Sequence, residues 1–271
     1  MKIRLIPPLL SPVLLPVLVL LFVLLSGISS AAHAQTKPVP LFLQENLDIH
    51  GRQLPIDKDL EKILIYFERE SGLRLDWRML PWNRAQMMGR NGEGIVFGLS
   101  KSPERIKYFQ FSQPVVSEKI WAITYGEPRQ DFRTLEDLRG KTVSIGRGFS
   151  HGMDFEKARN VVFTVQEDSA SSGARFKKLM NKRSDLMLWP VRQLNTAAQV
   201  EDYLNNKLIP GFNDPELKGK RFYVSRKPVF YDTVHFAVAQ GQYQEELARL
   251  NEVLRRGTES GELPKLMAKF Y

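Results

Sequence analysis

The stretch Leu99-Ser100-Lys101-Ser102-Pro103-Glu104-Arg105 follows a short apolar run, 95–99, that lies between glycines and is typical of a buried strand. The strand is expected to end in hydroxyl side chains, and the turn after it brings an arginine back toward the strand end. A planar guanidinium beside hydroxyls can clamp a carboxylate through two parallel, charge-assisted hydrogen bonds. The same residues would also fit a helix cap, with Ser102 as the capping residue and Arg105 as a solvated charge, and spacing leaves both open.

Apolar periodicity upstream and downstream of this stretch predicts alternating helices and strands. Leu60, Ile63, Leu64 and Phe67 repeat at helical spacing, so a helix is expected over 57–71, with Gly72 at its end. The alternating pattern at 73–78 predicts a strand directly after it. The same criteria predict strands at 143–145, 161–165, 186–188 and 235–239, and helices at 134–140, 152–159, 172–181, 243–254 and 263–270. Such alternation favours an α/β architecture with largely parallel sheets.

The first residues have the features of an export signal. Lys2 and Arg4 precede an apolar run at 9–25, and Ala32-His33-Ala34 then offers a small-x-small cleavage site before Gln35. We therefore predict a cleavable signal peptide over 1–34 and a periplasmic protein. The alternative is an uncleaved membrane anchor, because the run approaches the ~20 residues that span a bilayer.

Composition excludes several classes of protein. The chain has 271 residues, of which 43% are hydrophobic and 25% charged, as in ordinary globular proteins. The absence of cysteine excludes disulfides, thiolate metal sites and a cysteine nucleophile. No histidines have metal-ligand spacing, no concentrated basic stripe indicates nucleic acid, and nothing indicates a cofactor. The net charge of +9 favours anionic partners.

Two segments could carry the chain between two lobes. One lies near 121–131 and the other near 219–228, where a loop rich in Lys and Arg precedes a new strand. If both are crossings, one lobe contains 35–125 and the returning segment 223–271, and the other lobe contains 126–222.

Several motifs of the chain resemble those of the family 3 bacterial extracellular solute-binding proteins, the periplasmic receptors of polar amino acid importers. Their pattern of a hydroxyl residue, two residues, Arg and then Phe-Ser-x-Pro is matched by Ser102, Arg105, Phe111, Ser112 and Pro114. Further matches follow in the family's order: Glu70-Ser71-Gly72-Leu73, Leu135-Glu136-Asp137-Leu138-Arg139-Gly140-Lys141 and Ser260-Gly261-Glu262-Leu263.

The resemblance implies a two-lobe fold of the type II periplasmic-binding-protein kind, with a ligand cleft between the lobes and a two-segment hinge. It assigns the ligand's carboxylate to Arg105, helped by the Ser100 hydroxyl and the Gly98 carbonyl. The family's Gly-x-Thr turn on the second lobe is matched by Gly148-Phe149-Ser150. The resemblance also implies a monomer that delivers its ligand to an ABC-type permease in the inner membrane.

One departure bears on the ligand. The position at which the family carries an aspartate for the ligand's ammonium group is occupied by Pro190, which cannot accept that charge through its side chain. Recognition of an ordinary α-amino acid is therefore in question, and an organic acid, a modified amino acid or a signalling role remain open.

Two enzyme hypotheses stand beside the receptor hypothesis. Gly148-Phe149-Ser150-His151-Gly152 matches the G-x-S-x-G pattern of serine hydrolases, and Asp214 or Asp232 and then His235 follow in the matching order. A glycine-rich ligand-binding turn is the favoured interpretation of this stretch, because the motif is short and common by chance. A dehydratase on the same fold is the other alternative. We predict a protein without catalytic activity.

Aromatic residues are expected near several strand ends, where α/β folds bind ligands. Trp82 and Trp121 are the candidates for ligand contact together with Phe149, although aromatic side chains more often belong to a core. The group as a whole comprises Trp82, Phe111, Trp121, Phe149 and Trp189.

Overall fold

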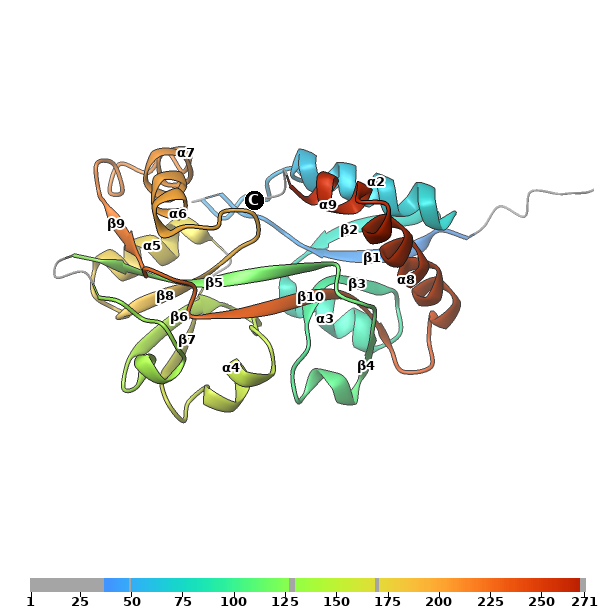
Figure 1. Ribbon diagram of the computed structural model, residues 1–271, viewed down its shortest axis with the longest axis horizontal. Coiled ribbons are helices and arrows are strands. Elements are labelled where there is room, and N and C mark those ends of the chain that lie inside the picture. Colours follow the sequence, from blue (N-terminus) through green and yellow to red (C-terminus); the bar gives the residue numbers. More distant parts are fainter. Residues whose placement is uncertain (1–36, 49, 127–129, 169–170, 269–271) are drawn as a thin grey trace, which may run out of the picture. The chain divides into compact units, whose positions relative to one another are not determined.

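The structure is a computed structural model that describes residues 37–48, 50–126, 130–168 and 171–268 (Figure 1). The predicted signal peptide over 1–34 and the end of the last predicted helix at Phe270 lie outside the described residues. Residues from Pro38 onward form one compact unit. In the part of the chain that the structure describes, no helix combines the length and apolarity needed to cross a membrane.

The described strands form one sheet of ten strands, with the order β2-β1-β3-β10-β5-β8-β6-β7 and with β4 beside β10 and β9 beside β5. The strands are β1 (Val39–Gln44), β2 (Leu75–Leu80), β3 (Ile95–Ser100), β4 (Phe109–Phe111), β5 (Val116–Tyr125), β6 (Thr142–Gly146), β7 (Thr164–Asp168), β8 (Leu186–Val191), β9 (Phe222–Val224) and β10 (Phe230–Ala239). The helices are α2 (Lys58–Ser71), α3 (Trp82–Arg90), α4 (Met153–Ala158), α5 (Ser172–Met180), α6 (Ala197–Tyr203), α7 (Ile209–Gly211), α8 (Gln244–Glu259) and α9 (Glu262–Met267), with 3₁₀ turns at Arg105–Lys107 and Glu136–Leu138.

Local sequence explains the helix α2 that was predicted over 57–71. The Asp57 side chain accepts hydrogen bonds from the backbone N–H groups of Asp59 and Leu60, which have no partner within the helix. Gly72 ends the helix with φ of 66°, a conformation that other residues adopt at a cost. The predicted apolar face of α2, including Ile63, Leu64 and Phe67, is buried.

The prediction of largely parallel sheets is wrong, because the sheet is mixed. β1 pairs in parallel with β2 and β3, and β6 pairs in parallel with β7 and β8. The centre of the sheet is antiparallel, since β10 runs antiparallel to β3, β4 and β5, and β5 runs antiparallel to β8 and β9. The two long strands β5 and β10 thus join two parallel arrays, and no helix precedes β10 to give the βαβ pattern.

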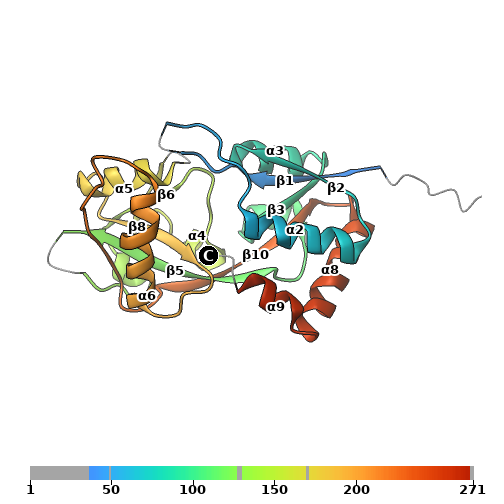
Figure 2. The same ribbon diagram turned by 90° about the horizontal axis from the view of Figure 1, so that it is seen from above.

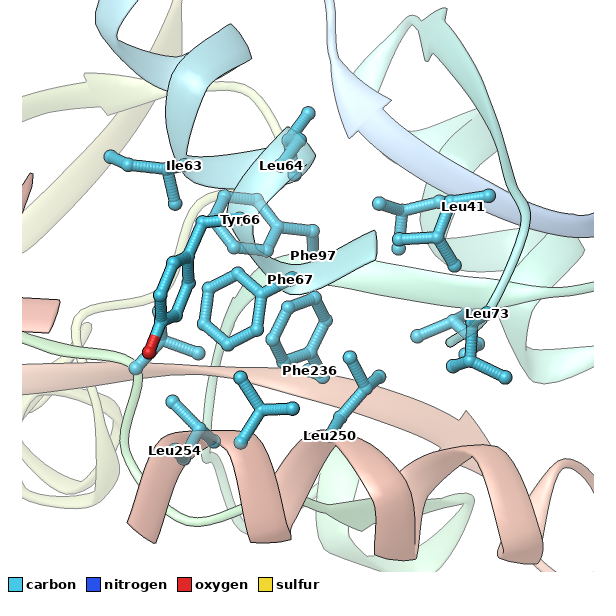
Figure 3. Packing of buried hydrophobic residues seen from close by; sticks show 14 of the residues in the cluster. Leu41, Ile63, Leu64, Tyr66, Phe67, Leu73, Phe97, Phe236, Leu250 and Leu254 are labelled. Atoms are coloured by element: carbon cyan, nitrogen blue, oxygen red, sulfur yellow. The ribbon is translucent and has the colours of Figure 1, made fainter. Parts of the chain in front are cut away.

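The hydrophobic side chains form separate cores on the two sides of this antiparallel centre. The first lobe is defined by clusters that draw on β1–β4, α2, α3, α8, α9 and the end of β10. Figure 3 shows its centre, where Phe236 lies between Phe67 and Phe97, with ring centroids 4.9 and 5.1 Å away, above Leu250 of α8. The second lobe is defined by clusters that draw on β6–β9, α4–α7 and the larger part of β5.

Several elements were not predicted from the sequence. β1 and α3 in the first lobe are among them, as is the helical segment of α6 and α7 in the second lobe. That segment continues from α6 through a π-helical stretch at Leu204–Leu208 into α7. The predicted strand at 161–165 begins later, at Thr164, because Asn160 takes a positive φ of 57° and the chain turns there.

Candidate functional site

A cavity of about 910 Å³ is lined by residues of both lobes. Its first-lobe wall comes from the segment between β1 and α2, from the end of β2 and from the start of α3. Its second-lobe wall comes from the end of β6, the start of α5, the end of β8 and the helical segment 203–213. The volume is within the range of small-molecule binding sites. The lining residues include Trp82, Phe149, Arg175, Trp189, Pro190, Arg192 and Phe212.

Figures 1 and 2 both show that the segment between β1 and α2 extends from the first lobe toward α5 of the second lobe. It folds as a small hairpin, since Leu47 pairs with Gln53 and the Asp48 N–H donates to the Arg52 carbonyl at 2.9 Å. The Asp48 carboxylate accepts from the backbone N–H groups of His50 and Arg52 and forms an ion pair with the Arg52 guanidinium at 2.7 Å. These bonds lower the pKa of Asp48. The carboxylate is therefore occupied within its own hairpin.

Arg105 contacts both lobes. Its guanidinium donates to the Ser100 carbonyl at 3.0 Å, to Oε1 of Gln86 at 2.8 Å and to the carbonyl of Gly148 at 2.9 Å. Gln86 also donates to the Gly148 carbonyl, at 3.1 Å. Burial lowers the pKa of Arg105 to about 10, so the side chain stays charged at neutral pH. The backbone N–H of Arg105 is capped by the Ser102 hydroxyl at 3.1 Å, so the predicted cap is present, but the Arg105 guanidinium is buried and hydrogen-bonded and is not a solvated charge.

Gly98 and Ser100 lie on β3 next to Arg105. Leu99 faces His235 and Phe97 faces Phe236, so Gly98 is the extra residue of a bulge against β10. Its φ of 86° requires glycine, and a Cβ there would meet no atom within 4 Å. The bulge therefore leaves open space beside the strand at the predicted ligand position.

The second-lobe turn at 148–150 faces α3 of the first lobe. Gly148 has φ of 74°, and a Cβ there would lie 1.8 Å from Oδ1 of Asn83. The Ser150 hydroxyl is buried and has no hydrogen-bond partner among the described residues. Nε2 of the neighbouring His151 is buried and unpartnered too, and burial, with smaller contributions from Arg175 and Arg105, lowers the pKa of His151 to about 3. This histidine is therefore neutral at physiological pH.

The predicted aromatic residues separate into two groups. Trp82 and Phe149 line the cavity, from the first and second lobe respectively, and Trp189 lines it as well. Trp121 is 1% exposed and packs in the second-lobe core, away from the cavity wall. Phe111 packs edge-on against His235 at 5.7 Å in the first lobe.

Asp232 lies on β10, close to the start of α4. A Cβ on Gly152 would be 2.6 Å from its Oδ1 atom, which accepts from the Thr233 N–H at 2.7 Å. Burial raises the pKa of Asp232 to about 6, and the nearby Ser100 hydroxyl and Arg105 charge oppose that rise.

The arrangement required for a serine hydrolase is not assembled. His235 places Nδ1 at 2.8 Å from the Ser112 carbonyl and Nε2 at 3.0 Å from the Thr233 hydroxyl, so it does not contact Ser150. Asp214, the other candidate acid, forms an ion pair with Lys177 at 3.0 Å. Ser150 thus has no base to activate it in this structure.

Among the residues described, no three His, Asp or Glu side chains gather in a group that could hold a metal ion.

Arg175 is the cavity residue that sequence reasoning missed. It lies inside α5, is 5% exposed, and donates from Nη2 to the carbonyls of Ser144 and Leu188, both at 3.2 Å. Its guanidinium lies 5.8 Å from the ring centroid of Trp189. Lys177 and Lys178 follow within the same helix and form ion pairs, and the sequence holds no signal that separates the unpaired Arg175 from these paired lysines.

No protein-family model and no curated protein sequence matches the chain. Solved structures do match it. The substrate-binding protein of an amino acid ABC transporter is 18% identical, with a TM-score of 0.61 over 87% of this chain and 99% of that chain. The GluR0 ligand-binding core from Nostoc punctiforme, in complex with L-glutamate, is 15% identical, with a TM-score of 0.62 over 86% of this chain and 99% of that chain.

An ancestral amino acid-binding protein, a precursor of cyclohexadienyl dehydratase, is 17% identical, with a TM-score of 0.60 over 86% of this chain and 94% of that chain. At these identities the similarity shows the fold. The prediction of a two-lobe α/β fold of the type II periplasmic-binding-protein kind is confirmed.

Proposed function

We propose that this protein is a solute-binding protein that captures a small ligand bearing an acidic group between its two lobes. The observation that carries the proposal is the cavity of about 910 Å³, whose walls come from both lobes. A ligand there contacts both lobes at once. The ligand therefore binds the closed form more tightly than the open form, and this difference in affinity is what allows a ligand to shift an open–closed equilibrium.

The sequence divides the chain into a signal peptide at 1–34, a first lobe over 35–125 and 223–271, and a second lobe over 126–222. The hydrophobic clusters favour shifted boundaries, because Trp121, Ile123 and Val224 pack with the second lobe. Strands β5 and β10, which run side by side between the two sets of hydrophobic clusters, form the two-segment hinge. Ile120 of β5 and Val229, just before β10, pack in a second-lobe cluster. The chain is therefore expected to bend where β5 and β10 pair in the antiparallel centre, a few residues away from the lobe boundaries given above.

Arg105 is the proposed clamp for the acidic group. Its three acceptors in this structure are the oxygens of Ser100, Gln86 and Gly148, and a ligand oxygen would replace those of Gln86 and Gly148. Charge-assisted bonds of this kind contribute about 1.5–3 kcal/mol each. Of the remaining residues predicted for ligand contact, Trp82 and Phe149 line the cavity, and Ser100, Gly98 and Ser150 do not. Trp121 is not proposed as a ligand contact, because it packs in the second-lobe core.

The protein is proposed to act as a monomer in the periplasm and to pass its ligand to an ABC-type permease in the inner membrane. The amino acid ABC transporter named for one structural neighbour supports this partner. We propose no catalytic activity, since no base is hydrogen-bonded to the Ser150 hydroxyl among the described residues. The ancestral dehydratase precursor among the structural neighbours makes dehydratase activity the alternative to test.

A thermal-shift screen of the purified protein against amino acids, organic acids and polyamines tests the proposal. At a hundredfold excess over its Kd, a ligand adds about 2.7 kcal/mol to the free energy of unfolding. For a chain of this size the midpoint should rise by roughly 5–10 °C. Arg105→Ala should weaken binding of the best ligand about tenfold or more, and Arg84→Ala, an exposed position on α3, serves as its control. A protein that responds to no member of the panel would refute the proposal.

A further inference from the structure

Arg175 is a buried cation without an acidic partner. No carboxylate lies within ion-pair distance of it among the described residues, and its hydrogen bonds go to two neutral backbone carbonyls from one nitrogen. Its Nε atom is buried without a hydrogen-bond partner. A buried guanidinium is costly unless its charge and its donors are satisfied. Something else is therefore expected to complete this group.

Of the other arginines in the cavity wall, Arg147 is exposed to solvent, and Arg192 and Arg52 have carboxylate partners. Arg192 forms an ion pair with Glu118 at 2.6 Å, and Arg52 forms one with Asp48 at 2.7 Å. Arg175 differs from both because it is buried and lines the cavity without forming an ion pair. The carboxylate that acts on its charge, Asp168, is ion-paired with Lys178.

The rest of the wall indicates what kind of molecule would bind to Arg175. Aromatic side chains from both lobes surround the cavity: Trp82, Phe149, Trp189 and Phe212. Pro190 lies directly after Trp189 and offers no charge for an amine. The second-lobe wall, which holds Arg175, contains no carboxylate among the described residues. In the first-lobe wall, Asp48 is bonded within its hairpin and Asp57 caps α2, so Glu45 is the one remaining carboxylate among the described residues there and lies on the other lobe from Arg175.

We propose that the ligand is an aromatic organic acid without an amino group, and that its anionic group binds the Arg175 guanidinium while its ring packs among the aromatic walls. This inference rests on the proposed solute-binding function and names its ligand class. It places the principal anion contact on the second lobe, because Arg175 lines the cavity and Arg105 does not. Arg105 then acts on the ligand through the contact that it makes between the lobes.

A purely structural role is the competing explanation, in which Arg175 ties β6 to β8 through the Ser144 and Leu188 carbonyls. That role uses Nη2 alone. It predicts that removing the guanidinium lowers stability without any preference for the charge of the ligand.

Three matched probes separate the explanations: phenylacetate, its neutral twin phenylacetamide, and zwitterionic L-phenylalanine. Binding is measured by calorimetry on the full protein. The wild type should bind phenylacetate at least tenfold more tightly than either of the other two. Arg175→Met should lose at least tenfold in phenylacetate affinity, Arg175→Lys should retain part of it, and Arg183→Met, which removes an exposed charge from the same lobe, should retain all of it.

A second variant keeps the test decisive if Arg175→Met does not fold. Pro190→Asp places a carboxylate at the cavity wall and should weaken phenylacetate at least tenfold by repulsion. Equal affinity for phenylacetate and phenylacetamide, or unchanged phenylacetate affinity in a folded Arg175→Met or Pro190→Asp protein, would overturn the inference. If none of the three probes binds but the broader panel yields a ligand, the inference fails and the proposed function stands. If nothing binds in either experiment, both fail.

Discussion

The contact between Arg105 and Gly148 predicts that Arg105 holds the two lobes together even without a ligand. The guanidinium lies on the first lobe and donates to a second-lobe carbonyl at 2.9 Å, and Gln86 of α3 donates to the same oxygen at 3.1 Å. Arg105→Met removes the charged donor while keeping the apolar stem. The open form should become more populated in consequence.

The size of the shift follows from the bond that is lost. A hydrogen bond from a charged donor contributes about 1.5–3 kcal/mol, which corresponds to a change of about 10- to 150-fold in the closed-to-open ratio. Gln86→Leu removes a neutral bond worth about 0.5–1.5 kcal/mol and should shift the ratio less. Because both donors share one acceptor, the two effects should not be additive.

Distance measurements between spin labels can follow this equilibrium, since the chain has no native cysteine. Met87→Cys on α3 and Val161→Cys on the second lobe provide exposed attachment sites, with exposed fractions of 55% and 77%. Arg105→Met should broaden the distance distribution and move it to longer values, whereas Arg84→Met, an exposed arginine of α3, should leave it unchanged. An Arg105→Met distribution identical to that of the parent protein would refute the role of Arg105 in closure.

Three further predictions concern stability and chemistry. Burial raises the pKa of Asp232 from 3.8 to about 6. The free energy of unfolding should therefore fall by up to about 3 kcal/mol as the pH rises from about 4 to 6 and this buried carboxyl ionises. Denaturant titrations should show a smaller fall for Asp232→Asn. Gly94→Ala brings a Cβ to 2.6 Å from the Pro40 carbonyl oxygen and should lower the free energy of unfolding by about 1–3 kcal/mol. In the same assay, Gly211→Ala should change it by less than about 0.5 kcal/mol, because a Cβ at Gly211 meets no atom within 4 Å. Ser150→Ala should leave any turnover of p-nitrophenyl acetate at the wild-type rate, and a clear loss of turnover would revive the hydrolase hypothesis.

Elements with strong local signals were predictable from the sequence. Helix α2 has an apolar stripe, an aspartate cap and a glycine stop, and each of these acts within a few residues. Helix α5 and the short strand β6 were placed within one residue of their observed bounds for the same reason. The last helices were also expected near their observed positions, because Leu247, Leu250 and Leu254 repeat at helical spacing.

Strand direction and the cavity wall were not predictable, because both depend on contacts between distant segments. The antiparallel centre arises where β5 meets β10, more than a hundred residues later in the chain. Helix α3 begins after Pro81, without a side-chain cap, so its start had no local signal beyond that proline. Arg175 differs from an ordinary helix-surface arginine only through the strands and the cavity around it.

The central claim is that a small ligand binds in the cavity between the lobes, and a calorimetric titration with a blocked cavity tests it most directly. Gly211 lines the cavity, and a Cβ there meets no atom within 4 Å, so Gly211→Trp adds an indole to the wall and Gly211→Ala is its matched control. We expect the best ligand of the panel to bind the wild type and Gly211→Ala with one site per chain, and to bind a folded Gly211→Trp protein at least tenfold more weakly. Equal affinity for all three proteins would place the ligand elsewhere and contradict the account.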